Sequence, residues 1–309
     1  MTIGAETDFA ETPARGLPLG VPRRDPGYGR TPAYGVAGSR PARPAFPARA
    51  QPWPKVSVVI PTLNEARNLP HVFAELPPGL HEVIIVDGNS VDDTVATARR
   101  LRPDVRIVRQ NRCGKGNALA CGFAAATGDI IAMVDADGSA DPAEIPQFVQ
   151  ALLDGADFAK GTRFAGGGGS CDITRLRRLG NRMLSGLVNL LCRTRYSDLC
   201  YGYNAFWRHH APVFGLYTES DVPAGSGTRL WGDGFEVETL INIRVAQAGL
   251  KVTEVASYEH SRIHGVSNLN ATSDGWRVLR TIFAERYYHH QRQKAERRRR
   301  ISSSPGRGA

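Results

Sequence analysis

Short runs of apolar, mostly β-branched residues alternate in the middle of the chain with stretches whose apolar positions follow a helical period. Four runs predict strands, at Val56–Ile60, Val83–Val86, Val105–Val108 and Ile130–Val134. The stretches among them predict helices at Asp92–Leu101 (beginning near Ser90), Gly116–Ala126 and Pro142–Leu153. This alternation predicts an α/β fold, with a mostly parallel sheet that is flanked by helices on both faces.

The alternating pattern ends before both termini. Residues 1–54 hold half of the chain's prolines, many glycines and few large apolar residues. Such a segment has little apolar surface to offset the entropy of ordering, so we expect it to be disordered. The folded domain is therefore expected over residues 55–272. Residues 273–309 are expected to form a C-terminal helix, from Gly275 to about Lys294, and a basic tail.

The formal net charge of +9 predicts an anionic partner: a nucleotide, a phospholipid surface or nucleic acid. Nucleic acid is not expected, because the charge is concentrated toward the ends and no RNA-recognition aromatic motif is present. The five cysteines match no zinc pattern, so we expect reduced thiols in a cytoplasmic protein. No run approaches about 18 apolar residues, so a membrane substrate would be met by peripheral contact at the inner face of the cell membrane.

Polar clusters follow three of the predicted strands. They are PTLNE at residues 61–65, DGNS at 87–90 and DADG at 135–138. Parallel strands present their carboxyl ends at one edge of the sheet, where ligands bind in open α/β folds. We therefore expect the three clusters to converge on one site.

The DADG cluster is a candidate metal site. Asp135 and Asp137 are carboxylates one residue apart at the end of a strand, and such hard oxygen ligands suit Mg²⁺ or Mn²⁺ bridging a diphosphate. An EF-hand is a poor alternative, because Gly138 comes too early and Pro146 stands where the closing glutamate should be.

Residues 114–117, GKGN, open a predicted helix and offer a flexible turn, a cation and a helix N-terminus, which together favour phosphate. The turn fits neither a Walker loop nor the G-x-G-x-x-G fingerprint. An ordinary loop lysine at position 115 remains the alternative for the motif taken alone.

Four motifs, taken in order, resemble those of the family 2 glycosyltransferases of the GT-A (nucleotide-diphospho-sugar transferase) fold. They are VSVVIPTLNE, VDGNSVDDT, GKGNAL and VDADG. In the second motif Gly88 stands where the family usually has another aspartate. Five later motifs make the chain most similar to the dolichol- and polyprenol-phosphate mannosyl- and glucosyltransferases. They are GTRF from Gly161, RMLS from Arg182 with Asn189, DLCYGY from Asp198, FEVE from Phe235, and RIHGVSNL from Arg262 with Asn268 replacing the usual lysine.

The resemblance implies inverting transfer of a hexose from a nucleoside-diphosphate sugar, of the GDP-mannose or UDP-glucose type, with polyprenyl phosphate as the expected acceptor and Mg²⁺ or Mn²⁺ as cofactor. Metal ligation falls to Asp135 and Asp137. Donor binding falls to Pro61, Thr62, Asn64, Glu65, Asp87, Asn89, Lys115, Asp135 and Ala136. Acceptor binding falls to Arg182, Ser185, Arg262 and Ser267, and the catalytic candidates are Asp137, Glu238, Asp198 and Arg163.

The acceptor decides whether a base is needed. A sugar hydroxyl must lose a proton, for which Glu238 and Asp198 are the candidates and Glu236 a weaker one. A lipid phosphate is already ionised and needs cations instead, which Arg182 and Arg262 could supply. A glycosyltransferase acting on a sugar hydroxyl therefore remains the alternative.

Two segments after residue 170 carry apolar stripes. In Leu176–Leu191 the apolar spacing most often indicates a core-facing helix, and a basic amphipathic helix lying on a membrane is the alternative. The aromatic residues of Thr194–Trp207 are expected in the core or along a sugar or lipid cleft.

Three other functional classes fit less well. A nucleotidyltransferase would favour a basic, glycine-rich loop after the first strand, where this chain has PTLNEARN. A glycoside hydrolase could use paired carboxylates but gives no reason for a metal–diphosphate motif. A non-enzymatic nucleic-acid binder would account for the charge and leave the acidic strand ends unexplained.

Overall fold

The computed structural model describes residue 46 and residues 52–216, 230–265 and 271–303. Most of the segment predicted to be disordered, the end of the basic tail and the predicted acceptor residue Ser267 lie outside the described residues. Phe46 and Trp53, which belong to the segment predicted to be disordered, have their rings 4.8 Å apart and pack against the core.

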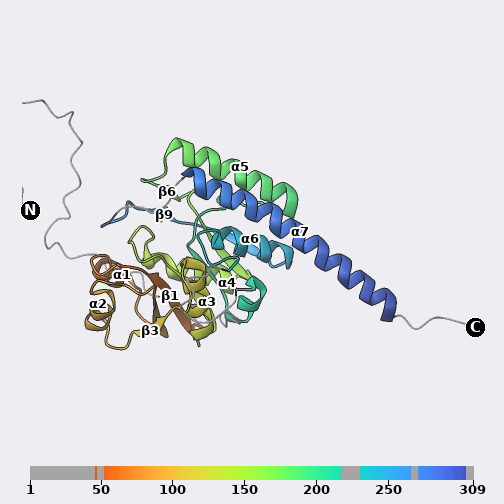
Figure 1. The fold of residues 1–309 in the computed structure, drawn as a ribbon. Helices are drawn as coiled ribbons and strands as arrows, with labels where there is room; N and C mark the ends of the chain where they lie inside the picture. Colours follow the sequence, from red (N-terminus) through yellow and green to blue (C-terminus); the bar gives the residue numbers. More distant parts are fainter. Residues whose placement is uncertain (1–45, 47–51, 217–229, 266–270, 304–309) are drawn as a thin grey trace, which may run out of the picture. The chain divides into compact units, whose positions relative to one another are not determined.

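A seven-stranded sheet forms the centre of the domain, in the order β3-β2-β1-β4-β7-β5-β8. Figure 1 shows β1 and β3 of this sheet among the surrounding helices. The strands are β1 (Val56–Thr62), β2 (Glu82–Asp87), β3 (Arg106–Arg109), β4 (Ile130–Met133), β5 (Phe158–Thr162), β7 (Asn204–Trp207) and β8 (Val252–Ala256). Strand β7 runs antiparallel to both of its neighbours, and the other pairs are parallel. A second, two-stranded sheet pairs β6 (Gly169–Ser170) with β9 (Tyr258–Glu259). The predicted α/β fold is confirmed.

The helices are α1 (Leu69–Glu75), α2 (Thr94–Leu101), α3 (Lys115–Ala125), α4 (Ile145–Leu153), α5 (Arg175–Cys192), α6 (Val237–Gln247) and α7 (Ala271–Ser303), with short 3₁₀ turns at Pro142–Glu144 and Arg208–Phe214. Helix α2 begins later than predicted, because the Asp92 carboxylate accepts the backbone N–H groups of Ala66 and Thr94 and stays in the preceding loop. Helix α7 is longer at both ends than predicted. Among the described helices, none combines the length and the apolar character that crossing a bilayer requires.

Alternate side chains of the central strands enter two different cores. Val58 and Ile60 of β1 pack with α1 and α4, whereas Val59 packs with α3 and α6. Burial on both faces explains why the strands read as nearly continuous apolar runs. The sheet is thereby held rigidly between two layers of helices, and its carboxyl edge becomes a fixed platform.

Helix α5 corrects the favoured interpretation of its segment. Four of the five apolar residues of the predicted stripe are exposed, Leu176 66%, Leu179 57%, Met183 68% and Leu190 78%, and only Leu187 is partly buried. The buried side is partly polar, because Asn181 accepts the backbone N–H of Cys200 and Ser185 accepts that of Leu199. Buried backbone donors need partners, and α5 provides them. The prediction that the apolar stripe of α5 faces the core is therefore wrong.

Candidate active site

A cleft of about 850 Å³ opens at the carboxyl edge of the sheet. Its wall combines the ends of β1 and β4, the start of α3, and the N-terminal parts of α5 and α7. Six of the residues predicted to bind donor line it: Pro61, Thr62, Glu65, Lys115, Asp135 and Ala136. The convergence expected from the parallel strands is thus present in the structure.

Lys115 joins two carboxylates inside the cleft. Its Nζ lies 2.7 Å from Asp135 Oδ1 and 2.6 Å from Glu238 Oε1. Burial alone would lower the pKa of Lys115, but the two carboxylates outweigh it and hold the pKa above its ordinary value. The lysine therefore carries a permanent positive charge between the end of β4 and the start of α6.

Arg262 makes the matching contact to the second aspartate. One guanidinium nitrogen lies 3.0 Å from Asp137 Oδ2 and the other lies 3.2 Å from Glu65 Oε1. The other oxygen of Asp137 accepts the backbone N–H and the hydroxyl of Ser139. Burial raises the pKa of Glu65, although Asn68 and Arg262 oppose the shift. Each aspartate of the DADG cluster is thus paired with a cation from a distant segment.

The donor set of the cleft fits a hard divalent cation. Asp135 and Asp137 offer carboxylate oxygens, and Asp135 keeps about a third of its side chain exposed. Within the described ranges, no group of three or more His, Cys, Asp or Glu side chains forms a closed metal cage. Two carboxylates suit Mg²⁺ or Mn²⁺, because such ions keep waters and take their remaining ligands from substrate phosphates. The ion would have to share these carboxylates with Lys115 and Arg262.

The glycines of the GKG turn are required by a close backbone approach. A side-chain Cβ on Gly116 would lie 1.7 Å from the carbonyl oxygen of Gly232, and one on Gly114 would lie 2.0 Å from that of Asp233. The backbone N–H of Gly116 donates to the Asp233 carbonyl, and Arg112 binds the Asp233 carboxylate through two 2.8 Å hydrogen bonds. The turn that carries Lys115 is therefore locked against the segment before α6.

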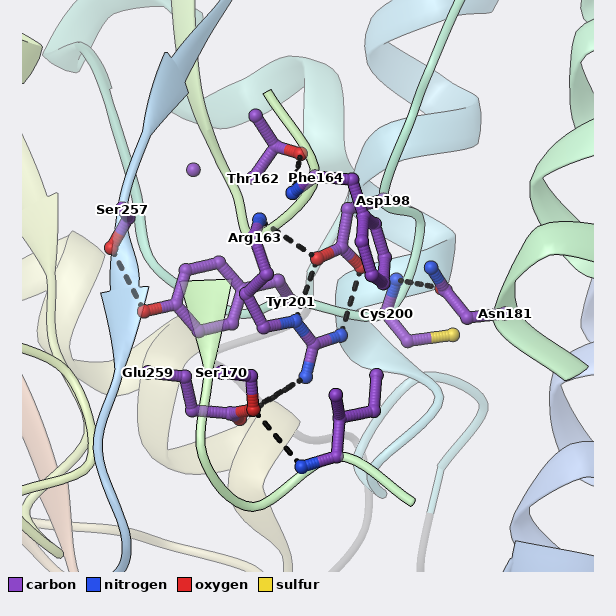
Figure 2. A network of polar contacts seen from close by, with 12 residues as sticks. Thr162, Arg163, Phe164, Ser170, Asn181, Asp198, Cys200, Tyr201, Ser257 and Glu259 are labelled. Atoms are coloured by element: carbon purple, nitrogen blue, oxygen red, sulfur yellow. Dashed lines mark hydrogen bonds and ion pairs between the residues drawn. The ribbon is translucent and has the colours of Figure 1, made fainter. Parts of the chain in front are cut away.

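Arg163 lies in a network of carboxylates rather than free in the cleft (Figure 2). Its Nε and Nη2 donate to Asp198 at 2.7 and 2.9 Å, and its Nη1 donates to Glu259 at 3.0 Å. The guanidinium also lies 4.9 Å from the centre of the Tyr201 ring. Because Glu259 and Arg163 both line the cleft, the network forms part of its wall.

This geometry does not favour Asp198 as a general base. The residue is fully buried, and both of its oxygens accept hydrogen bonds from Arg163. Burial would raise the pKa of Asp198, but the hydrogen bonds and charge of Arg163 dominate and lower it. A carboxylate that holds its proton so weakly and has no free oxygen is a poor proton acceptor. The structure gives Asp198 the task of holding Arg163.

The remaining predicted donor residues shape the loops beside the cleft. Asn64 and Asn89 adopt left-handed backbone conformations, with φ of 58° and 64°. Asn64 accepts the backbone N–H of Val91, and the buried Asp87 accepts that of Ser90. Gly88, which replaces the usual aspartate, lines the cleft, whereas its neighbours Asp87 and Asn89 are not among the lining residues.

The predicted acceptor residues separate into different environments. Arg262 lines the cleft, and so do Arg177 and Arg277, which the sequence did not single out. Arg182 is exposed and is not among the residues that line the cleft, while Ser185 lies in the interior beneath Leu199. Glu238 and Glu236, the other candidate bases, line the cleft.

Sequence reasoning missed three charged residues that hold the site together. They are Glu259, Asp233 and the fully buried Lys160, whose Nζ donates to the carbonyls of Gly161 and Tyr201. Burial lowers the pKa of Lys160. Glu259 is 96 residues from Arg163 and Asp233 is 121 from Arg112, so no local spacing links them. A charged residue within an apolar strand, as Lys160 is in FAKGT, was the one available signal.

An α/β sheet whose carboxyl edge carries two aspartates paired with cations, beside a locked glycine turn, suits an enzyme that acts on phosphate-bearing donors. The model of glycosyl transferase family 2 matches residues 57–211. An uncharacterized glycosyltransferase of Mycobacterium tuberculosis is 32% identical over 232 residues, which are 72% of this chain and 97% of that protein. The chain belongs to glycosyl transferase family 2 and is an enzyme of that class.

Two further proteins are similar to the chain. A dolichol-phosphate mannosyltransferase of Pyrococcus furiosus is 36% identical over 121 residues, covering 37% of this chain and 34% of that protein. The crystal structure of glucosyl-3-phosphoglycerate synthase from Mycobacterium tuberculosis, in complex with Mn²⁺, uridine-diphosphate and phosphoglyceric acid, superimposes with a TM-score of 0.56 at 24% identity. The superposition covers 75% of this chain and 78% of that one, and it shows the shared GT-A fold.

Proposed function

We propose that this glycosyltransferase moves a hexose from a nucleoside-diphosphate sugar, of the GDP-mannose or UDP-glucose type, to a polyprenyl phosphate, with inversion at the anomeric carbon. The observation that carries the proposal is the pairing of both aspartates of the DADG cluster with cations inside one cleft, Asp135 with Lys115 and Asp137 with Arg262. Fixed cations beside carboxylates suit a diphosphate and its divalent ion.

Departure of the diphosphate leaves negative charge on its oxygens. Mg²⁺ or Mn²⁺ held by Asp135 and Asp137 would act there as a Lewis acid. Lys115 and Arg262 lie next to the same carboxylates and can turn to the phosphate oxygens as the donor enters. Lys115 keeps its proton throughout, because Asp135 and Glu238 hold its pKa high. Its charge is therefore available to the leaving group at any physiological pH.

The choice of a phosphate acceptor is supported by the state of the carboxylates. Asp198 is occupied by Arg163, and Glu238 is held at 2.6 Å by Lys115. A hydroxyl acceptor needs a carboxylate that is free to take its proton, whereas a phosphate oxyanion brings its own nucleophile. Arg262, Arg177 and Arg277 line the cleft and can offset repulsion between two phosphate-bearing substrates.

The test is a panel of nucleoside-diphosphate sugars with Mg²⁺ or Mn²⁺, offered together with a short-chain polyprenyl phosphate, with 3-phosphoglycerate and with simple glycosides. Nucleotide release and product mass identify the pair of substrates that reacts. Glu238→Gln and Arg262→Ala are then compared by kcat/KM on that pair. With a lipid phosphate, Arg262→Ala should lose about 10- to 150-fold, equivalent to about 1.5–3 kcal/mol for a charged hydrogen bond. Glu238→Gln should be milder.

The opposite ranking would count against the lipid phosphate. A loss of about 10²–10⁴-fold in Glu238→Gln, with Arg262→Ala near wild type, is what removal of a general base produces. Glycoside product would then be expected, and the acceptor would be a sugar hydroxyl. Transfer to 3-phosphoglycerate alone would keep the phosphate chemistry and reject the lipid.

A further inference from the structure

Helices α5 and α7 lie side by side (Figure 1), and each exposes apolar side chains. Leu184, Leu187 and Leu191 of α5 belong to one apolar cluster with Val278 and Ile282 of α7, and this marks the side on which the two helices meet. At 100° per residue, the exposed stripe of α5 lies next to this contact side and not opposite to it. The exposed stripe of α5, which consists of Leu176, Leu179, Met183 and Leu190, therefore borders α7.

Helix α7 exposes aromatic residues of its own. Trp276 is 70% exposed, Phe283 55%, Tyr287 60% and Tyr288 49%. These side chains surround a shallow apolar groove together with Leu279. Single exposed apolar side chains are ordinary, but this many on two adjacent helices indicate an interaction site. We refer to these residues of α5 and α7 as the α5/α7 face.

The exposed charged residues within α5 and within residues 275–295 of α7 are all basic. Helix α5 contains four arginines and no acidic residue, and Arg175, Arg178 and Arg182 are exposed. Residues 275–295 of α7 contain one acidic residue, Glu285, and this is buried against Arg244. The exposed charges of that stretch are basic: Arg277, Arg280, Arg286, Arg292 and Lys294.

The basic charge of the α5/α7 face indicates which kind of partner binds there. A second copy docking through the same face would bring arginines against arginines, which opposes association. An anionic lipid surface satisfies both features at once, because its headgroups attract the arginines and its acyl chains accept the apolar side chains. Tryptophan and tyrosine at the edge of such a face suit the interface between water and hydrocarbon.

The two helices also reach the cleft. Leu176, Gly180 and Leu184 of α5 and Gly275 and Val278 of α7 line it. Leu176 belongs both to the exposed stripe and to the cleft wall, so the apolar surface continues into the site. We propose that the α5/α7 face docks on an anionic lipid bilayer and guides the chain of a lipid acceptor into the cleft. The guiding role rests on the proposed function, whereas the docking does not.

The test uses the full chain and vesicles of phosphatidylglycerol and phosphatidylcholine that contain neither donor nor acceptor. Met183 and Leu190 are 68% and 78% exposed and lie outside the cleft wall, so Met183→Glu/Leu190→Glu should fold normally. Burying one such side chain is worth about tenfold or more in partitioning. The double variant should therefore bind at least about 100-fold more weakly. The control is Val91→Glu, which places a charge at an apolar residue that is 92% exposed and precedes α2, far from α5 and α7 in the sequence. This control should bind normally.

A second readout locates the contact. Brominated lipid should quench fluorescence in the wild type, and Trp276→Phe should remove that quenching, since Trp276 is the largely exposed tryptophan of the face. Undiminished vesicle binding by the double variant would assign binding to the basic ends of the chain and overturn the proposal. A complete lack of binding to anionic vesicles would also overturn it. So would the finding that the wild type is a dimer and the double variant a monomer. Failure to use polyprenyl phosphate would reject the proposed function and leave vesicle binding unaffected.

Discussion

Replacing Asp198 with asparagine distinguishes a structural carboxylate from a catalytic one. The substitution keeps the shape of the side chain and removes its charge. In the wild type Asp198 is fully buried and accepts from the backbone N–H of Arg163 at 3.2 Å, from Nε at 2.7 Å and from Nη2 at 2.9 Å. After the change, Arg163 retains Glu259 at 3.0 Å as its charged partner.

The expected loss of stability follows from these contacts. Removing one partner of a buried ion pair typically costs about 3–5 kcal/mol. Because Arg163 stays paired with Glu259, we expect the free energy of unfolding to fall by about 3 kcal/mol, at the lower end of this range. In a domain of this size that corresponds to a fall in Tm of roughly 6–12 °C. A total stability of about 5–15 kcal/mol leaves the variant folded at low temperature.

The assay combines urea unfolding followed by circular dichroism with turnover measured well below the Tm. Asp104→Asn is the matched control, because Asp104 forms an exposed ion pair with Arg102 at 3.1 Å. Asp104→Asn should change the free energy of unfolding by no more than about 1 kcal/mol. Folded Asp198→Asn should retain much of the wild-type kcat, since Arg163 is still held by Glu259.

The pH dependence adds a check on sign. Arg163 lowers the pKa of Asp198 in the folded state, so the pair contributes stability above the unfolded value of about 3.9. That contribution disappears as the pH falls through the lower folded pKa, and the stabilities of wild type and variant should then converge. Unchanged stability together with a kcat loss of about 10²–10⁴-fold would refute this reasoning and restore Asp198 as the general base.

Two further predictions concern the donor side of the cleft. Gly116→Ala should lower the midpoint of urea unfolding and also the donor affinity measured by calorimetry, because its Cβ would lie 1.7 Å from the Gly232 carbonyl oxygen. The control, Gly186→Ala, has nothing within 4 Å of its Cβ and should be neutral or slightly stabilising. Equal behaviour of the two variants would mean that the turn can move away without cost. Asp137→Asn should abolish transfer without unfolding the protein, as should excess chelator, and full activity under either condition would exclude the metal role.

The central sheet was predictable where local patterns carry the information. The runs that form β1, β2, β3 and β4 are apolar, short and bounded by polar clusters, so both their existence and their shared edge followed from the sequence. Strands β5 and β7 were not predicted. Phe158–Thr162 contains a buried lysine and a glycine, and Asn204–Trp207 is four residues long, so their pairing depends on distant neighbours.

The residues of the candidate site were likewise predictable only where a local motif carries them. Asp135, Asp137 and Lys115 follow local motifs, and the structure brings them together. The partner of Arg163 could not be read from spacing, because Asp198 and Glu259 are 35 and 96 residues away. The orientation of α5 was misjudged because its polar residues Asn181 and Ser185 are needed inside, where they bind backbone groups of the next loop.

The position of β7 between β4 and β5 affects the order in which the protein can be built. As the chain leaves the ribosome, β4 and β5 are complete by Thr162, yet each still lacks the neighbour that Asn204–Trp207 will provide. Until then the growing sheet has unpaired edges, the kind of surface on which nascent chains aggregate. Arg163 and the residues of α5 are synthesised during that interval. The joining of β5, and of the edge strand β8 beyond it, to the rest of the sheet thus depends on the later synthesis of β7.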